Sequence, residues 1–292
     1  MNEYYERIMS LNESDDIKNI LKRWNNFSKN KIKLPHNVPV VLPDMLWITK
    51  PGYGKTNLLN LISEYLDSER LMEFYGDVKF FEYSLKYRTN ERFEEEFNRF
   101  TGAILNAAGF RSEFKGVICI DIDEWIDHID DRNFIWFLEY LSDNTYDWHV
   151  IFSVSSPKQN KIDKVEVLLS TYFRIEKVTF KMPETEELLE YIKDNVSMYG
   201  FNISEKALKI LNETISELRD GKYFDGYKTL NMICTDLIYR IASQDEFDGY
   251  IITDKIVNCY SYNSEFIKKT KADLEKRNRI GFEISGGETC EK

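Results

Sequence analysis

Two glycines, a lysine and a threonine stand close together at Gly52, Gly54, Lys55 and Thr56. Glycines in a strand-to-helix turn let backbone N–H groups approach phosphate oxygens closely. A lysine ammonium can reach the β- and γ-phosphates of a nucleotide, and a threonine hydroxyl is a ligand for Mg²⁺. An apolar stretch precedes these residues, and a segment of helical periodicity follows them. The sequence therefore predicts a phosphate-binding loop that holds a nucleotide and Mg²⁺.

This loop differs from the usual pattern G-x-x-x-x-G-K-[ST] at its first position, where Thr49 replaces a glycine. Pro51 and Gly52 still favour a tight turn there. We therefore interpret the motif as degenerate and present. The residues expected to contact the nucleotide are Pro51, Gly52, Tyr53, Gly54, Lys55, Thr56 and Asn57.

Acidic residues end a second apolar segment, in which Asp121, Asp123 and Glu124 follow the stretch 117–120. Beside a phosphate loop, an aspartate at a strand end typically holds the Mg²⁺ shell, and a glutamate orients or deprotonates the attacking water. Alternation along a strand would place Asp121 and Asp123 on one face, so either can be the metal ligand alongside Thr56. We slightly favour Asp123 and Glu124 as the acidic pair, with Glu124 as the catalytic carboxylate.

Hydroxyl side chains and an arginine supply further candidates. Ser155 and Ser156 follow the apolar stretch 148–154, from which they could hydrogen-bond the γ-phosphate or the attacking water. A helix N-cap before Pro157 is the competing interpretation of both serines. Arg174 could stabilise γ-phosphate charge in a neighbouring subunit, or it could form a surface ion pair. The expected catalytic set is Glu124, Ser155, Ser156 and Arg174.

These residues need a scaffold that brings distant strand ends together. Strand and helix patterns alternate from residue 45 to about 160, and a short fifth strand is expected within 168–180. Such alternation predicts a parallel sheet with crossover helices, in which ligands bind at the carboxyl ends of the strands. We therefore expect an α/β fold, with a three-layer core around a parallel sheet and a small α-helical domain after it.

Helical patterns replace strands after Met182, where Ser204 is a good N-cap and helices are expected at 227–241 and from 252. In the N-terminal region, Ile17, Ile20, Leu21 and Trp24 can share one helix face. The expected organisation is a helical arm and lead-in at 1–43, an α/β core at 44–182, a helical domain at 183–262 and a charged, partly disordered tail at 263–292.

Composition excludes several classes of protein. The 292 residues are 42% hydrophobic and 14% aromatic, which argues against disorder, and no apolar run reaches the length of a membrane span. The N-terminus lacks the features of a signal peptide, so a cytoplasmic location is expected. The four cysteines and three histidines are too scattered to indicate a zinc site, a disulfide framework or a histidine-based triad.

A net charge of −11 disfavours a protein that coats nucleic acid with its whole surface. Two local basic stretches, at 18–33 and 268–279, keep nucleic-acid binding open as a partner class. Solvated helix faces are the plainer explanation of both stretches.

With these motifs in place, the chain resembles the AAA+ ATPases, P-loop NTPases of the ASCE division. Residues 49–56 look like their Walker A motif, 120–124 like Walker B, and 155–156 like sensor 1. The passage 173–188 looks like their link from core to helical lid. The resemblance covers roughly residues 38–262. It implies an ATP site between core and lid, oligomerisation that brings a neighbour's arginine to that site, and remodelling of a macromolecule.

The family's sensor 2 arginine has no clear match in this sequence, and Lys228 is the best cationic substitute. The primary interpretation is a Mg²⁺-dependent ATPase, slow because its motifs are degenerate, that acts as a homo-oligomer or with another protein. One alternative is a nucleotide-gated switch with little or no hydrolysis. Others are a DNA-linked loader or transposition-type ATPase that uses the basic stretches, and a small-molecule P-loop kinase.

Overall fold

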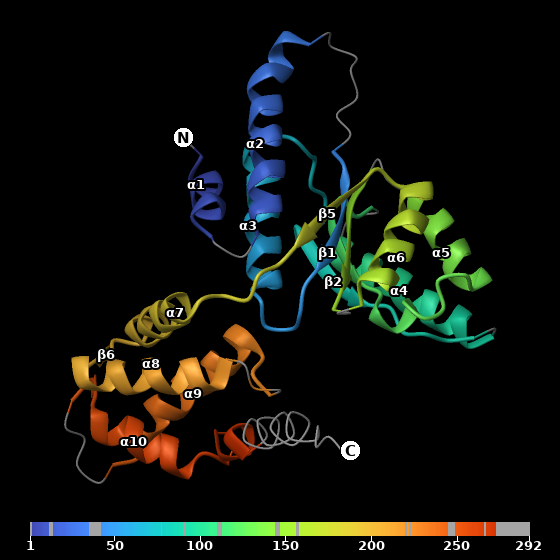
Figure 1. The fold of residues 1–292 in the computed structure, drawn as a ribbon. Coiled ribbons are helices and arrows are strands. Elements are labelled where there is room, and N and C mark those ends of the chain that lie inside the picture. The colour runs from blue at the N-terminus through green and yellow to red at the C-terminus, as the bar shows by residue number, and fades with distance from the viewer. Residues whose placement is uncertain are drawn as a thin grey trace, which may run out of the picture. The chain divides into compact units, whose positions relative to one another are not determined.

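A computed structural model of the chain describes residues 2–272, apart from positions 12–13, 35–41, 77, 90, 110–112, 144–146, 156–157, 220, 222, 245–248 and 266. The described chain divides into two compact units (Figure 1). The first comprises Met1–Lys50 and Gly54–Lys181, and the second comprises Pro51–Tyr53 and Met182–Lys292. The C-terminal tail beyond 272, predicted to be partly disordered, lies outside the described residues.

Five parallel strands form the centre of the first unit, in the order β2-β3-β4-β1-β5. β1 lies between β4 and β5, pairing Met45 with Ile151 and Asp44 with Ile175. Met45, Leu46 and Trp47 are fully buried, as expected of a central parallel strand covered on both faces. The sheet confirms the predicted α/β fold. Its strands are β1 (Asp44–Ile48), β2 (Phe80–Ser84), β3 (Gly116–Asp121), β4 (Trp148–Val154) and β5 (Ile175–Thr179).

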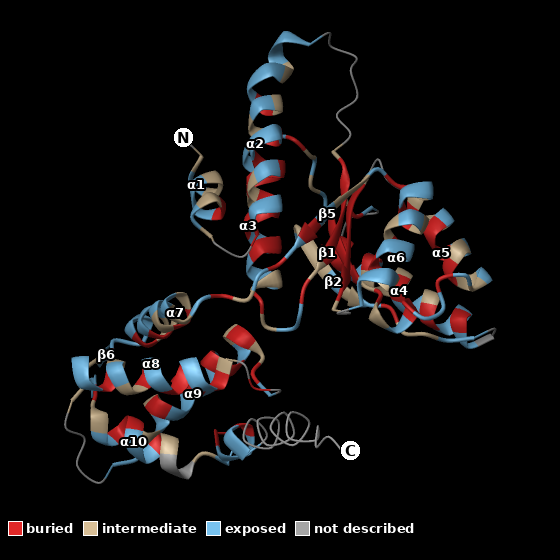
Figure 2. Cartoon of the chain, in the orientation of Figure 1, coloured by how far each residue is buried: buried red, intermediate tan, exposed pale blue. Residues whose placement is uncertain are grey.

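Helices cover both faces of this sheet, with α1, α2 and α3 on one face and α4, α5 and α6 on the other (Figure 1). Each of these helices has buried residues, and exposed residues lie on its outer side (Figure 2). The helices are α1 (Glu3–Ser10), α2 (Asp15–Asn30), α3 (Lys55–Ser68), α4 (Glu91–Ala108), α5 (Arg132–Ser142) and α6 (Gln159–Tyr172), with short 3₁₀ turns η1 (Lys31–Lys33) and η2 (Asp123–Trp125).

An aromatic core fills the space between the sheet and α4, α5 and α6. Ile118 and Ile120 of β3 contribute to it, whereas the intervening Cys119 points to the other face because strand side chains alternate. Phe100 of α4 and Phe137 of α5 meet edge to face, with ring centroids 5.0 Å apart. The opposite face, toward α3, therefore carries Cys119 and the polar residues at the ends of β3 and β4.

The N-terminal arm packs on the first unit through one face of α2. Ile17, Ile20, Leu21 and Trp24 are all buried, as their spacing predicts. The side chain of Ser14 caps the helix by accepting a hydrogen bond from the N–H of Ile17. The lead-in positions 35–41 lie outside the described residues.

The second unit is helical, with its own apolar core from residues that include Leu188, Leu211, Leu230 and Ile256. A two-stranded parallel ladder joins β6 (Asn202–Ile203) to β7 (Ile251–Ile252). The helix expected from 252 therefore begins later, because Ile252 pairs with Ile203 as a strand. The helices are α7 (Thr185–Met198), α8 (Glu205–Arg219), α9 (Gly226–Ala242) and α10 (Asp254–Asn263). None of the helices in the described ranges is long and apolar enough to span a membrane.

Candidate nucleotide site

The predicted phosphate loop leads from β1 to the first turn of α3. Gly52 and Gly54 have φ angles of 82° and 81°, in the left-handed region that favours glycine. Gly54 is the N-cap of α3 and supplies no side-chain hydrogen bond to the first turn. The first N–H groups of a helix carry partial positive charge, so an uncapped helix start attracts anions. The conformation of this turn is thus compatible with the predicted phosphate loop.

Lys55 and Thr56 occupy the first positions of α3 and face the sheet. The Lys55 ammonium lies 3.4 Å from the Ser153 hydroxyl on β4 and 3.1 Å from a carboxylate oxygen of Glu82 on β2. The Thr56 hydroxyl donates to the other carboxylate oxygen of Glu82, at 2.5 Å. The two residues that sequence reasoning assigns to phosphate and metal therefore share one acidic partner.

Electrostatics keep Lys55 charged in this position. Burial alone would lower its pKa, but the carboxylates of Glu82 and Asp121 hold the pKa above its ordinary value. Burial raises the pKa of the Cys119 thiol to about 12, so this sulfur is neutral near pH 7. The acidic side chains, rather than the thiol, supply the negative charge around Lys55.

Asp121 ends β3 and pairs with Ser153 across the β3–β4 ladder. Its Oδ1 accepts the N–H of Asp123 at 3.0 Å. Burial raises the pKa of Asp121, and the Asp123 N–H and the Lys55 ammonium offset that rise only in part. A partly buried carboxylate that interacts with the Lys55 ammonium is a suitable ligand for a divalent cation.

Asp123 has a different environment. Its two carboxylate oxygens accept both the N–H of Ser155, at 2.6 Å, and the Ser155 hydroxyl. The same-face argument for Asp121 and Asp123 fails, because β3 ends at Asp121 and the chain turns into η2 at Asp123. Asp123, just after β3, is thus hydrogen-bonded to Ser155, just after β4. Ser156, the other predicted hydroxyl, lies outside the described residues.

Glu124 is turned toward the segment that follows β2. Its carboxylate accepts the N–H of Tyr87 at 3.0 Å and the Lys86 ammonium at 2.8 Å. The hydrogen bond from Lys86 lowers the pKa of Glu124, against an opposing effect of burial. Glu124 is therefore an exposed, ionised carboxylate held by two donors.

Arg174 and Lys55 lie at opposite ends of the parallel strands. Arg174 directly precedes β5, which runs parallel to β1, so it sits at the amino ends of the strands, whereas Lys55 follows the carboxyl end of β1. There it lines a hollow of about 300 Å³ with Arg23 and Trp24 of α2. Within one copy of the chain, Arg174 and Lys55 are not brought together.

The remaining predicted contacts are distributed over both units. Asn57 is exposed in the first turn of α3. Lys228 lies in the first turn of α9 in the second unit, the unit that also includes Pro51–Tyr53.

Sequence reasoning missed Glu82, Ser153 and Lys86. Glu82 interrupts an aromatic strand, which was the available signal, and the register Glu82↔Cys119 places it on the face of the sheet next to α3. Ser153 is 3% exposed on the same face. Both residues are distant from Lys55 in sequence, and they contact it only because the sheet places β2 and β4 near α3.

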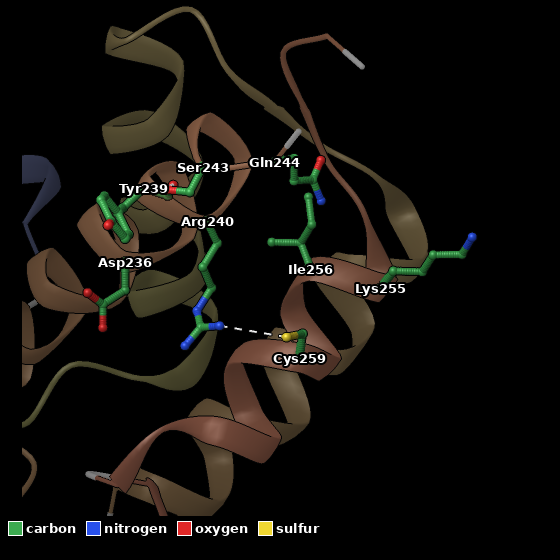
Figure 3. Close-up of a pocket in the computed structure, with 8 residues that line it drawn as sticks. All are labelled: Asp236, Tyr239, Arg240, Ser243, Gln244, Lys255, Ile256 and Cys259. Atoms are coloured by element: carbon green, nitrogen blue, oxygen red, sulfur yellow. Dashed lines mark hydrogen bonds between the residues drawn. The ribbon is translucent and has the colours of Figure 1, made fainter. Parts of the chain in front are cut away.

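A second hollow, of about 540 Å³, lies in the helical unit between α9 and α10 (Figure 3). Arg240 points across it toward the exposed Cys259, with 3.6 Å between Nη1 and Sγ. Asp236 and Lys255 place charges of both signs around its rim.

Comparisons with known proteins give one kind of match. A scan against protein-family models and a search of curated proteins both find none. Among solved structures, three variants of RuvB from Thermotoga maritima match with TM-scores of 0.51 to 0.52 and 14% sequence identity. These matches cover 86–87% of this chain and 70–72% of the RuvB chains. RuvB is a AAA+ P-loop ATPase. This chain shares the fold of these RuvB structures.

The AAA+ fold agrees with the resemblance drawn from the motifs at 49–56 and 120–124. It also agrees with the predicted parallel core followed by a helical part. At this level of identity the likeness establishes architecture, so the chemistry must be argued from the site itself.

Proposed function

We propose that this chain binds ATP with Mg²⁺ and hydrolyses it slowly. The observation that carries the proposal is the grouping of Lys55 and Thr56, at the uncapped start of α3, with Asp121 at the end of β3. An ammonium, a hydroxyl, a carboxylate and free helix N–H groups are the donors and acceptors that a magnesium–triphosphate complex requires. The residues present therefore fit the cofactor.

Each residue has a distinct part in this proposal. Lys55 and the N–H groups of the loop hold phosphate oxygens, and the Thr56 hydroxyl and Asp121 carboxylate ligate the metal. We assign the metal to Asp121 because Ser155 already occupies both oxygens of Asp123. Mg²⁺, when bound, neutralises charge that develops on the phosphate oxygens. Contacts from Pro51, Gly52, Tyr53, Asn57 and Lys228 to the nucleotide remain predictions.

Glu124 is the proposed base that orients and deprotonates water. To do so its carboxylate must leave Lys86 and Tyr87, which hold it in this structure. The same hydrogen bonds favour a second candidate function, a nucleotide-gated switch in which Glu124 stays held and ATP occupancy alone controls a partner. The two candidates make the same prediction for binding and opposite predictions for turnover.

We also propose that the protein acts as an oligomer. Arg174 is exposed, and it lies at the amino ends of the strands, away from Lys55 of its own copy. It is therefore placed to contact a second molecule, where it could stabilise phosphate charge. The partner is either another copy of this chain or a different protein.

The test measures ATP affinity and steady-state phosphate release with Mg²⁺ for wild type, Lys55→Ala and Glu124→Gln, with light scattering for assembly state. Lys193→Ala and Glu95→Gln are matched controls, since both residues are exposed on helices outside the site. We expect Lys55→Ala to lose binding and turnover, and Glu124→Gln to lose turnover alone. Tight binding by wild type without turnover would support the switch. Absence of binding by wild type would reject the nucleotide site.

A further inference from the structure

Glu82 contacts both Lys55 and Thr56, the proposed phosphate-binding and metal-binding residues. One carboxylate oxygen lies 3.1 Å from the Lys55 ammonium, and the other accepts the Thr56 hydroxyl at 2.5 Å. The Lys55 and Glu82 side chains are 24% and 29% exposed, so their interaction is partly shielded from water. A single internal anion therefore pairs with both Lys55 and Thr56.

The sheet fixes Glu82 in this place. It lies in the middle of β2, opposite Cys119 of β3, so its side chain emerges on the face toward α3. Asp121 lies two residues further along β3 and contributes to the same negative environment around Lys55. A metal-free triphosphate entering the loop would therefore meet two carboxylates and one ammonium.

A bound cation changes this balance. A hydroxyl that donates its proton keeps lone pairs on oxygen, so Thr56 can ligate a metal while it still donates to Glu82. With a cation held by Thr56, the negative charge of Glu82 would be favourable instead of repulsive. The same side chain thus opposes a bare triphosphate and accommodates its magnesium complex.

We propose that Glu82 makes nucleotide binding depend on Mg²⁺, by neutralising Lys55 in the empty site and by repelling nucleoside triphosphates that carry no metal. This inference rests on the proposed function, since it concerns the selectivity of the same site. Glu82 is a positioning residue in this arrangement, because it acts through Lys55 and Thr56.

The experiment compares ATP dissociation constants, measured by titration calorimetry, in Mg²⁺ and in EDTA. Glu82→Gln removes the charge and keeps the shape of the side chain. Glu82→Asp keeps the charge and tests rescue. Glu64→Gln is the matched control, because Glu64 is also 29% exposed and pairs with a lysine, Lys79, at 2.8 Å. Thermal unfolding of each variant establishes that it is folded.

We expect wild type to bind ATP at least roughly tenfold more tightly with Mg²⁺ than without it, since the negative charge of Glu82 repels the phosphates strongly when no cation lies between them. Glu82→Gln should reduce that ratio by about tenfold through tighter binding in EDTA, whereas Glu82→Asp and Glu64→Gln should retain it. An unchanged ratio in Glu82→Gln, or weaker binding in both buffers, would overturn the inference while leaving nucleotide binding intact. Absence of ATP binding by wild type in either buffer would reject the proposed function and this inference together.

Discussion

Replacing Asp44 with asparagine should add a pH dependence to the stability that the Asp44–His149 pair of the wild-type protein does not contribute. Asp44 begins β1, where its Oδ1 accepts the N–H of Val150 at 2.8 Å and lies 3.9 Å from Nδ1 of His149. Burial raises the pKa of Asp44 from 3.8 to about 7, with Val150 opposing, and lowers the pKa of His149 from 6.5 to about 4. The contact is thus between a neutral carboxyl and a neutral imidazole, rather than an ion pair.

The proton count in each state gives the sign. Between pH 4 and 6.5 the folded pair holds one proton, on Asp44, and the unfolded pair also holds one, on His149. The pair therefore adds no slope to the wild-type stability. In Asp44→Asn the folded state holds none and the unfolded state still holds one, so the free energy of unfolding rises with pH. The stability that neutral His149 contributes is present above pH 6.5 and lost as pH falls toward 4.

The magnitude follows from the pKa of His149. Because that pKa falls from 6.5 in the unfolded state to about 4 in the folded state, the free energy of unfolding of Asp44→Asn should change by about 3 kcal/mol over this pH interval, at about 1.4 kcal/mol per pH unit. His149→Asn should give the opposite slope, because Asp44 then holds a proton that the unfolded state releases. Asparagine at position 44 retains an oxygen acceptor for Val150, which limits other damage.

Urea unfolding at pH 4.5, 5.5 and 6.5 measures the difference in free energy between each variant and wild type. Groups elsewhere in the chain cancel in that difference. Stability differences that stay constant with pH in both variants would refute the assignment of neutral forms to this buried pair.

Three further outcomes test the site and its support. Lys86→Met should raise the rate of phosphate release by up to about fivefold with unchanged ATP affinity, because it frees Glu124 from an ion pair. The pair is exposed, and such pairs are worth about 0–1 kcal/mol. A slower rate would argue against the idea that Lys86 restrains Glu124. Phe100→Ala should cost about 3–5 kcal/mol in urea unfolding, since Phe100 is fully buried against Phe137. Ser155→Ala should cost about 1–2 kcal/mol through loss of its hydroxyl bond to the Asp123 carboxylate, which differential scanning calorimetry can measure.

The succession of strands and helices along the chain was predictable because β1 and β4 are mostly apolar and the glycine turn marks the start of α3. Lys55 and Thr56 could be identified for the same reason, since their chemistry is local to one turn. Glu82 could not, because its contact with Lys55 depends on β2 lying beside β3, which no local pattern specifies. The environments of Asp121 and Asp123 also required coordinates, because the sequence does not show that β3 ends between them.

The sheet order has a consequence for synthesis on the ribosome. β1 is made first among the five strands, but its partners are β4 and β5, which end at Val154 and Thr179. At about 5–20 residues per second, roughly 130 residues must be translated after β1 before both neighbours exist, a delay on the order of ten seconds. During that delay the Lys55 turn is attached to a strand without its sheet. The proposed ATP binding therefore requires the completed core, and we expect no effect of ATP on the folding of the nascent chain that first carries the loop.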